Sequence, residues 1–121
     1  MTRGICLTAS ALVLLAAPAF AQDMCGPAPA APVVPDGKKA TGPDLVQAKK
    51  DIDAFMKTSD DWQICLVTYR DQQVASAKDS KTAFDVRPIN TKITNNQKDK
   101  EKVGGDYNKQ VAAWRQAQPK K

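Results

Sequence analysis

The residues of this 121-residue chain with the most distinctive chemistry are its three cysteines, Cys6, Cys25 and Cys65. Thiolates can form disulfides, bind metals or act as nucleophiles, and spacing separates these roles. No Cys-x-x-Cys pair of the redox or metal-binding type is present. A structural disulfide is therefore the expected chemistry, and a reactive or intermolecular thiol is the alternative.

The N-terminus determines which cysteines can pair. Arg3 is followed by an apolar stretch, Ile5 to Ala17, and by Pro18-Ala19-Phe20-Ala21, which is the pattern of a secretory signal peptide with a small-x-small cleavage site. The stretch is shorter than the roughly 20 residues of a membrane span. We expect removal of residues 1–21 rather than retention as an anchor, and no lipidation, because Gln22-Asp23-Met24 precedes Cys25. Cys6 then leaves, and an oxidising location outside the cytoplasm favours pairing of Cys25 with Cys65.

Catalytic chemistry has little support in the composition. The chain contains no histidine, which excludes Ser-His-Asp and Cys-His catalysis and histidine-based metal sites. Three sets of carboxylates are close in sequence, but residues one or two apart on a helix point in different directions. These sets are Asp51 with Asp53, Asp60 with Asp61, and Asp99 with Glu101. We expect a solvated charged face, no enzyme, and no metal or other cofactor.

Positive charge is concentrated near the C-terminus. Residues 91–121 contain 8 basic and 3 acidic residues, whereas residues 22–90 contain 9 and 10. Such a segment could attract anionic envelope polymers or clients, while nucleic acid is disfavoured outside the cytoplasm. The possible anion-contacting residues are Lys98, Lys100, Lys102 and Lys109. An ordinary soluble helix face is the competing interpretation.

Residues 22–43 form a proline-rich arm. Five prolines fix φ and withhold amide donors, so the arm can be neither a helix nor a central strand. Within it, Pro35-Asp36-Gly37 predicts a turn in which Gly37 adopts positive φ.

A first helix is predicted over residues 44–79. Thr41 is the expected cap, Pro43 suits the first turn and Asp44 complements the positive helix end. Apolar residues alternate at three and four positions, which is typical of a coiled-coil-like seam. The seam positions are Leu45, Ala48, Ile52, Phe55, Ser59, Trp62, Leu66, Tyr69, Gln73 and Ser76. Thr58-Ser59-Asp60 is the point where this helix could bend or split.

A second helix is predicted over residues 89–117, after a connection at 80–88 that ends with Arg87-Pro88, because a residue before proline avoids the helical region. Gly104-Gly105 is either a close approach inside a continuous helix, which we favour, or a local break. The predicted fold is all-α: an antiparallel two-helix hairpin preceded by the extended arm.

Large side chains of the two helices suggest a register for the hairpin. If Phe55 faces Trp114, Trp62 faces Tyr107 and Leu66 faces Val103, three apolar layers form, and both tryptophans belong to the core. The polar run at 95–102 would then lie near the loop end, which should be poorly packed. A Cys25–Cys65 bond would lay the arm along the hairpin.

The order of these motifs resembles a family of small, functionally uncharacterised secreted proteins of Gram-negative bacteria. The shared pattern is Cys25-x-Pro27, a proline-rich run, Pro35-Asp36-Gly37, a Thr-Gly-Pro-Asp helix start, Cys65 and a late Tyr107-Asn108. The resemblance implies a periplasmic location and a single disulfide. It brings no known activity or catalytic residue.

Three functional hypotheses follow. The first is a non-enzymatic periplasmic helical protein that acts as an envelope-associated structural or protein-interaction module, with dimerisation through Met56, Ile64 and Val67 as one possibility. The alternative is a basic, chaperone-like binder of unfolded or anionic clients. A thiol-redox role is the third, and it lacks any visible feature that would lower a thiol pKa.

Overall fold

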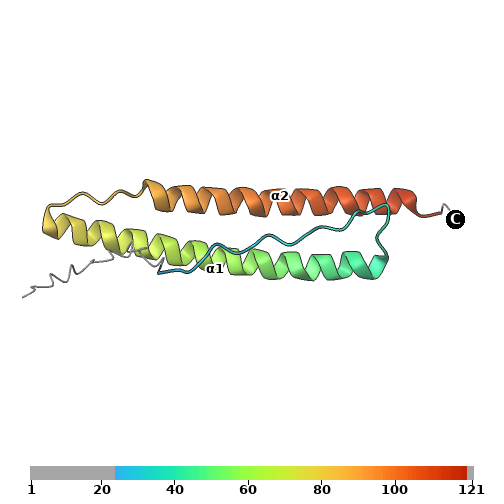
Figure 1. Cartoon of the computed structure of the whole chain (residues 1–121), viewed down its shortest axis with the longest axis horizontal. Coiled ribbons are helices and arrows are strands. Elements are labelled where there is room, and N and C mark those ends of the chain that lie inside the picture. Colours follow the sequence, from blue (N-terminus) through green and yellow to red (C-terminus); the bar gives the residue numbers. More distant parts are fainter. Residues whose placement is uncertain (1–23, 120–121) are drawn as a thin grey trace, which may run out of the picture.

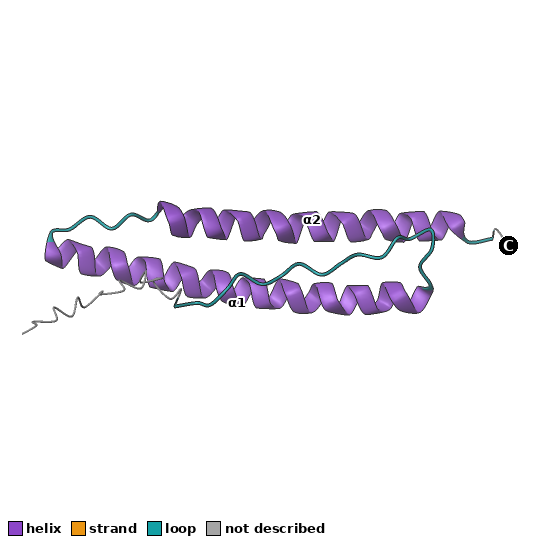
Figure 2. Cartoon of the chain, in the orientation of Figure 1, coloured by secondary structure: helices purple, strands orange, loops and turns teal. Residues whose placement is uncertain are grey.

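The computed structural model describes residues 24–119, and within them it contains two helices and no strand. Helix α1 spans Gly42–Ser80 and helix α2 spans Arg87–Ala117. The helices run antiparallel, and the N-terminal arm lies along them as an extended segment (Figures 1 and 2). The predicted all-α hairpin is confirmed. The expected signal peptide, residues 1–21, lies outside the described residues.

Helix α1 begins at a capping box. The Asp44 amide donates to Thr41 Oγ1 at 3.3 Å, and the Thr41 amide donates to Asp44 Oδ2 at 2.8 Å. Each residue thus satisfies an amide that the start of a helix leaves without a partner. The helix ends at Ser80 and is capped by Lys81, which adopts the left-handed conformation with φ 56°. The predicted cap is confirmed, and the helix bounds differ from the prediction by two residues or fewer.

The seam of α1 is buried as its spacing predicts. The buried residues are Leu45, Ala48, Ile52, Phe55, Ser59, Trp62 and Leu66. Farther along the helix, Tyr69 and Gln73 are half-buried and Ser76 is exposed. The helix continues through Thr58-Ser59-Asp60, where the Thr58 hydroxyl donates to the Ala54 carbonyl at 2.9 Å. No split occurs, because this hydroxyl bonds within the helix itself.

Helix α2 begins at Arg87, two residues before the predicted start, so the expectation that Arg87 stays outside the helix was wrong. Pro88 lies in the first turn, where an amide would lack an intrahelical partner in any case. The Asp85 carboxylate accepts the free Arg87 amide at 3.0 Å. The helix is continuous through Gly104-Gly105, and a Cβ at Gly104 would lie 3.7 Å from Met56 Cε. The favoured continuity of the helix is confirmed, but neither glycine is needed for a close approach, because 3.7 Å is an ordinary van der Waals contact and a Cβ at Gly105 would meet no atom within 4 Å.

The predicted register was wrong. Val103 packs with Ile52 and Phe55 rather than with Leu66. Leu66 and Trp62 instead pack with Ile89, at the start of α2.

The connection explains this shift. Residues 81–86 are not helical and run back beside α1 before α2 begins (Figure 1). An extended residue covers about 3.3 Å along the chain, whereas a helical residue covers about 1.5 Å. The extended connection therefore carries the chain farther back along α1 than the same number of helical residues would. Arg70 Nη1 accordingly meets Asn90 Oδ1 at 3.0 Å, and Phe84 packs edge-on against Tyr69. The loop end of the hairpin is therefore covered by the connection itself.

The turn in the arm also differs from the prediction. The amides of Lys39 and Ala40 both donate to the Asp36 carbonyl, at 3.0 and 2.8 Å. The turn therefore begins at Asp36, two residues later than a turn with Pro35 in its first central position. Gly37 does not have positive φ, whereas Gly26 does, at 70°. Gly37 is required for another reason: a Cβ there would lie 1.9 Å from the backbone oxygen of Gln110. The arm therefore presses directly onto the backbone of α2.

Candidate functional site

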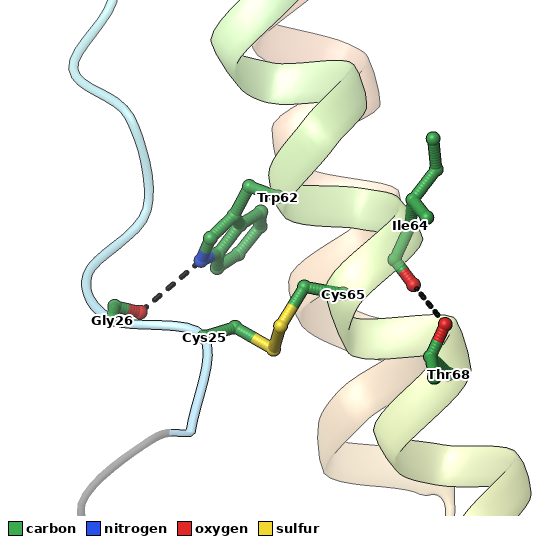
Figure 3. The surroundings of a disulfide bond; sticks show 6 residues. All are labelled: Cys25, Gly26, Trp62, Ile64, Cys65 and Thr68. Carbon is green, nitrogen blue, oxygen red and sulfur yellow. Dashed lines mark hydrogen bonds between the residues drawn. A yellow bond between two sulfur atoms is a disulfide. The ribbon is translucent and has the colours of Figure 1, made fainter.

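A disulfide joins the arm to α1. Cys25 and Cys65 are bonded with a Cα–Cα distance of 5.8 Å, as the sequence predicts (Figure 3). Trp62, one turn before Cys65, donates from Nε1 to the Gly26 carbonyl at 3.1 Å. Cys25 also packs against the cluster of Trp62, Leu66 and Ile89. Both sulfurs are thus used in a cross-link that fixes the beginning of the arm on the hairpin.

The arm lies along one side of the seam, and every third residue of it is partly buried there. Gly26, Pro29, Pro32 and Pro35 are half-buried, while most residues between them are exposed. A repeat of three matches the three residues per turn of polyproline II. Val34 packs onto the cluster of buried side chains near Val103, and the Gly37 amide donates to Gln110 Oε1 at 2.8 Å. The arm therefore acts as a third layer across α1 and α2.

A polar layer lies inside the seam. Ser59 and Asn96 are both buried, at 0% and 2% exposure. Asn96 Nδ2 donates to Ser59 Oγ at 3.1 Å, and Asn96 Oδ1 accepts from Gln63 Nε2 at 2.8 Å. Because an unpaired buried amide is costly, any register that separates these residues is disfavoured. This layer fixes how α2 lies on α1.

The other side of the seam is not covered by the arm. A groove of about 530 Å³ opens there, with mainly apolar walls. It is lined by Asp60, Gln63, Ile64, Val67, Thr68 and Ile93. Ile64 remains 65% exposed and points away from the arm (Figure 3). An isoleucine this exposed, next to an apolar groove, marks a candidate binding surface.

The four lysines proposed as anion contacts do not form one free cluster. Lys100 binds Asp60 across the helices, and its side chain is only 15% exposed. Lys102 pairs with Asp106, and Lys109 approaches the same carboxylate at 4.0 Å. Lys98 is exposed and lies one turn before Lys102. Most of the local positive charge is therefore balanced within the chain.

The sequence-adjacent carboxylates separate as the helix geometry requires. Asp60 pairs with Lys100 of α2, whereas Asp61 pairs with Lys57 of its own helix. Asp53 pairs with Lys49, and Asp51 accepts from Gln47 at 2.8 Å. Over residues 24–119 no group of three or more metal-ligating side chains gathers.

Three carboxylates have lowered pKa values: Asp44 and Asp85, which are exposed, and Asp106, which is half-buried. The Thr41 backbone amide, followed by the Thr41 hydroxyl, lowers the pKa of Asp44. The Arg87 side chain and then its amide lower the pKa of Asp85. A hydrogen bond from Lys102 lowers the pKa of Asp106. Asp44 and Asp85 thus stabilise the starts of the two helices, and Asp106 stabilises a face of α2.

The six predicted core residues fall into two groups. Phe55, Trp62, Leu66 and Val103 are buried. Tyr107 and Trp114 are half-buried, because the shift in register places them beside the beginning of α1. There the Tyr107 hydroxyl donates to the Leu45 carbonyl at 3.1 Å, and a Cβ at Gly42 would lie 3.6 Å from Trp114 Cζ2.

Comparison with protein-family models, curated proteins and solved structures finds no match for the chain. Among the described residues, neither helix is long and apolar enough to cross a membrane. The fold and the groove define a disulfide-clasped helical hairpin with one side open. The function must therefore be inferred from that surface.

Sequence reasoning missed two important residues. Asn96 lies in a polar run beside Asn95, which is exposed. Only the correct register, which places Asn96 opposite Ser59, would have shown that Asn96 is the buried one. Gln110 contacts the arm through its backbone and its side-chain oxygen, and no local pattern signals such a long-range contact. Of the three apolar residues that the sequence places outside the seam, Ile64 and Val67 line the groove. Met56 instead packs against the cluster of Ile52, Phe55 and Val103, so it is not available for dimerisation.

Proposed function

We propose that the protein is a non-enzymatic periplasmic interaction module that binds a helix of a protein partner on the open side of its hairpin. The observation that carries this proposal is the groove at Ile64, Val67 and Ile93, which two antiparallel helices form opposite the arm. Two packed helices present a groove that a further helix fills in helical bundles. The expected apolar anchors of the partner would meet Ile64 and Val67.

The clasped arm supports this function by limiting where a partner can bind. The arm occupies the Trp62 side of the seam through the disulfide and through Gly37. A partner therefore meets one defined side of the hairpin rather than two. A scaffold held in one shape loses little conformational entropy on binding, which favours affinity.

The ion pairs favour this module over a chaperone-like binder of anionic clients. Lys100 and Lys102 already have carboxylate partners, Asp60 and Asp106. Recruiting Lys100, whose side chain is only 15% exposed, to a client would require breaking a pair that joins the two helices. Binding an apolar partner in the groove breaks no ion pair within the chain.

The periplasmic location rests on the sequence and on the disulfide. The N-terminal pattern is that of an exported protein, and a Cys25–Cys65 bond persists in oxidising compartments. Mass spectrometry of protein recovered from a periplasmic fraction tests this location. We expect a chain that begins at Gln22 and has no free thiol, whereas full-length cytoplasmic protein with two reduced cysteines in residues 24–119 would contradict it.

The binding function is tested with a matched pair of variants in the bacterium that produces the protein. Ile64→Glu places a charge at the groove, and Val46→Glu places one at another exposed apolar position of α1, 58% exposed and away from the groove. After crosslinking and capture, wild type and Val46→Glu should retain the same protein partner, a second copy included, and Ile64→Glu should lose it. Equal capture by both variants would refute the proposal.

A further inference from the structure

We infer that the helix occupying the groove is α1 of a second copy of this chain, arranged antiparallel about a twofold axis that passes by Ile64. This inference rests on the proposed function, because it names the partner of the same groove. It is carried by the shape of the surface around Ile64 and by the charges on either side of it.

The surface around Ile64 combines a projection with a hollow. The Ile64 side chain is 65% exposed, and the groove beside it is bordered by Val67 and Ile93. A twofold interface uses the same patch on both copies, so a patch must fit itself. With the axis near Ile64, the isoleucines of the two copies meet at the centre of the contact, each beside the hollow of the other. The projection is thereby removed from water at the centre of the contact.

The charges on α1 match under the same axis. Lys57 and Asp71 lie seven residues before and after Ile64, which is two helical turns and therefore the same face. Their side chains are 79% and 63% exposed. Within the chain they pair with Asp61 and Arg70, but these are exposed pairs between neighbouring residues of one helix, which contribute little and can be exchanged at low cost. In an antiparallel pair of helices centred on Ile64, Lys57 of each copy meets Asp71 of the other. Two symmetric ion pairs then border the apolar centre.

Charges farther from the axis favour a crossing of the helices over side-by-side pairing along their full length. Lys50 and Lys78 lie fourteen residues either side of Ile64, about 21 Å along the helix axis. Collinear helices would bring these like charges together. Helices that cross at an angle separate them while keeping Ile64, Lys57 and Asp71 in contact.

The arm leaves this arrangement unobstructed. It joins α1 at Cys65 and approaches Trp62, and Ile64 points away from both (Figure 3). The contact can therefore form while the disulfide is intact and the arm is in place.

The first test is sedimentation equilibrium of the oxidised exported chain over a range of concentrations. Wild type and Val46→Glu should dimerise with the same dissociation constant, and Ile64→Glu should raise that constant by at least about 30-fold, as for a central interface residue. Circular dichroism checks that each variant keeps its helices. A wild-type chain that stays monomeric throughout, or a dimer that Ile64→Glu leaves intact, would overturn the inference.

A charge exchange keeps the inference testable if Ile64→Glu fails to fold. Lys57→Asp and Asp71→Lys should each weaken the dimer roughly threefold to tenfold, and the double variant should restore it. Within one chain these positions are about 21 Å apart, so rescue can arise only between copies. No recovery in the double variant would count against the predicted axis.

Failure of this inference and failure of the proposed function can be told apart. Suppose that the wild-type chain is monomeric, that wild type and Val46→Glu capture another protein, and that Ile64→Glu does not. The groove then binds a helix of that other protein, and only the second-copy inference fails. If the chain is monomeric and capture is the same for both variants, the proposed function fails as well.

Discussion

The indole nitrogen of Trp62 donates a hydrogen bond to the carbonyl of Gly26, 3.1 Å away, one residue from the disulfide between Cys25 and Cys65. The arm is therefore held by a covalent bond and by a hydrogen bond at adjacent positions. Because Gly26 has positive φ, at 70°, the chain can turn from the cysteine toward the indole at low steric cost. This joint determines which side of the hairpin the arm covers.

Reduction of the disulfide should destabilise the hairpin strongly. The bond closes a loop with a sequence separation of 40 residues. Such a closure contributes about 4 kcal/mol in the chain-entropy model, and the melting temperature of a domain this size should fall by roughly 15 °C or more. Thermal melts monitored by circular dichroism, with and without reductant, measure this effect. Cys25→Ser/Cys65→Ser should match the reduced protein, and a melt insensitive to reductant would disprove the stabilising role.

Removal of the buried amide should be costly. Asn96→Ala leaves the Ser59 hydroxyl and the Gln63 amide without their partner in the seam, which should lower the free energy of unfolding by about 1–3 kcal/mol. Asn95→Ala, at the exposed neighbouring position, is the control and should change stability by less than about 0.5 kcal/mol. Urea denaturation measures both. Equal effects at the two positions would mean that the polar layer does not contribute to stability.

Replacing Gly37 and Gly105 by alanine should change the stability of the protein in opposite directions, because the space around the two glycines differs. Gly37→Ala forces a Cβ to within 1.9 Å of the Gln110 backbone oxygen, so the arm must move and stability should fall by about 1–3 kcal/mol. Gly105→Ala meets no atom within 4 Å inside α2 and should stabilise by about 0.5–1 kcal/mol. Thermal melts distinguish the two. A neutral Gly37→Ala would show that the arm does not need this close approach.

Acid should weaken the fold through three carboxylates that accept hydrogen bonds. Asp44, Asp85 and Asp106 have lowered pKa values in the folded protein because they accept hydrogen bonds from Thr41, Arg87 and Lys102, respectively. Their stabilisation is fully present above the unfolded-state pKa of aspartate, about 3.9, and is lost as the pH falls through the lower folded-state values.

Melts between neutral pH and the acid range measure this dependence. Asp44→Asn should be less stable than wild type at neutral pH and should lose less stability on acidification, because one of the titrating groups is absent. If Asp44→Asn loses as much stability as wild type between neutral and acidic pH, the capping-box carboxylate contributes nothing to the acid sensitivity.

The helices could be predicted because their signals are local. The three-and-four spacing from Leu45 to Leu66 specified the buried face, and Thr41 with Asp44 specified the start of α1. The register could not be predicted in the same way. It depends on how far residues 81–86 travel along α1, and extended and helical residues differ twofold in length per residue.

The candidate site was only partly visible in the sequence. Cys25 and Cys65 could be paired because only two cysteines remain once Cys6 is assigned to the predicted signal peptide, and Ile64 stood out as an apolar residue off the seam. The contact between Gly37 and Gln110 keeps the arm on one side of the hairpin and so leaves the groove open. This contact joins residues far apart in sequence, and no local spacing encodes it.

Zero-length carbodiimide crosslinking followed by mass spectrometry tests the central claim most directly, because it joins an amine only to a carboxylate already in contact with it. Lys57 and Asp71 lie on one straight helix, about 21 Å apart, so a bond between them can form only between two copies. We predict a Lys57–Asp71 crosslink in the dimer fraction of wild-type protein, and its loss in Ile64→Glu. Dimers joined only through other residues, or Lys57 linked only to Asp61 of its own helix, would contradict the account.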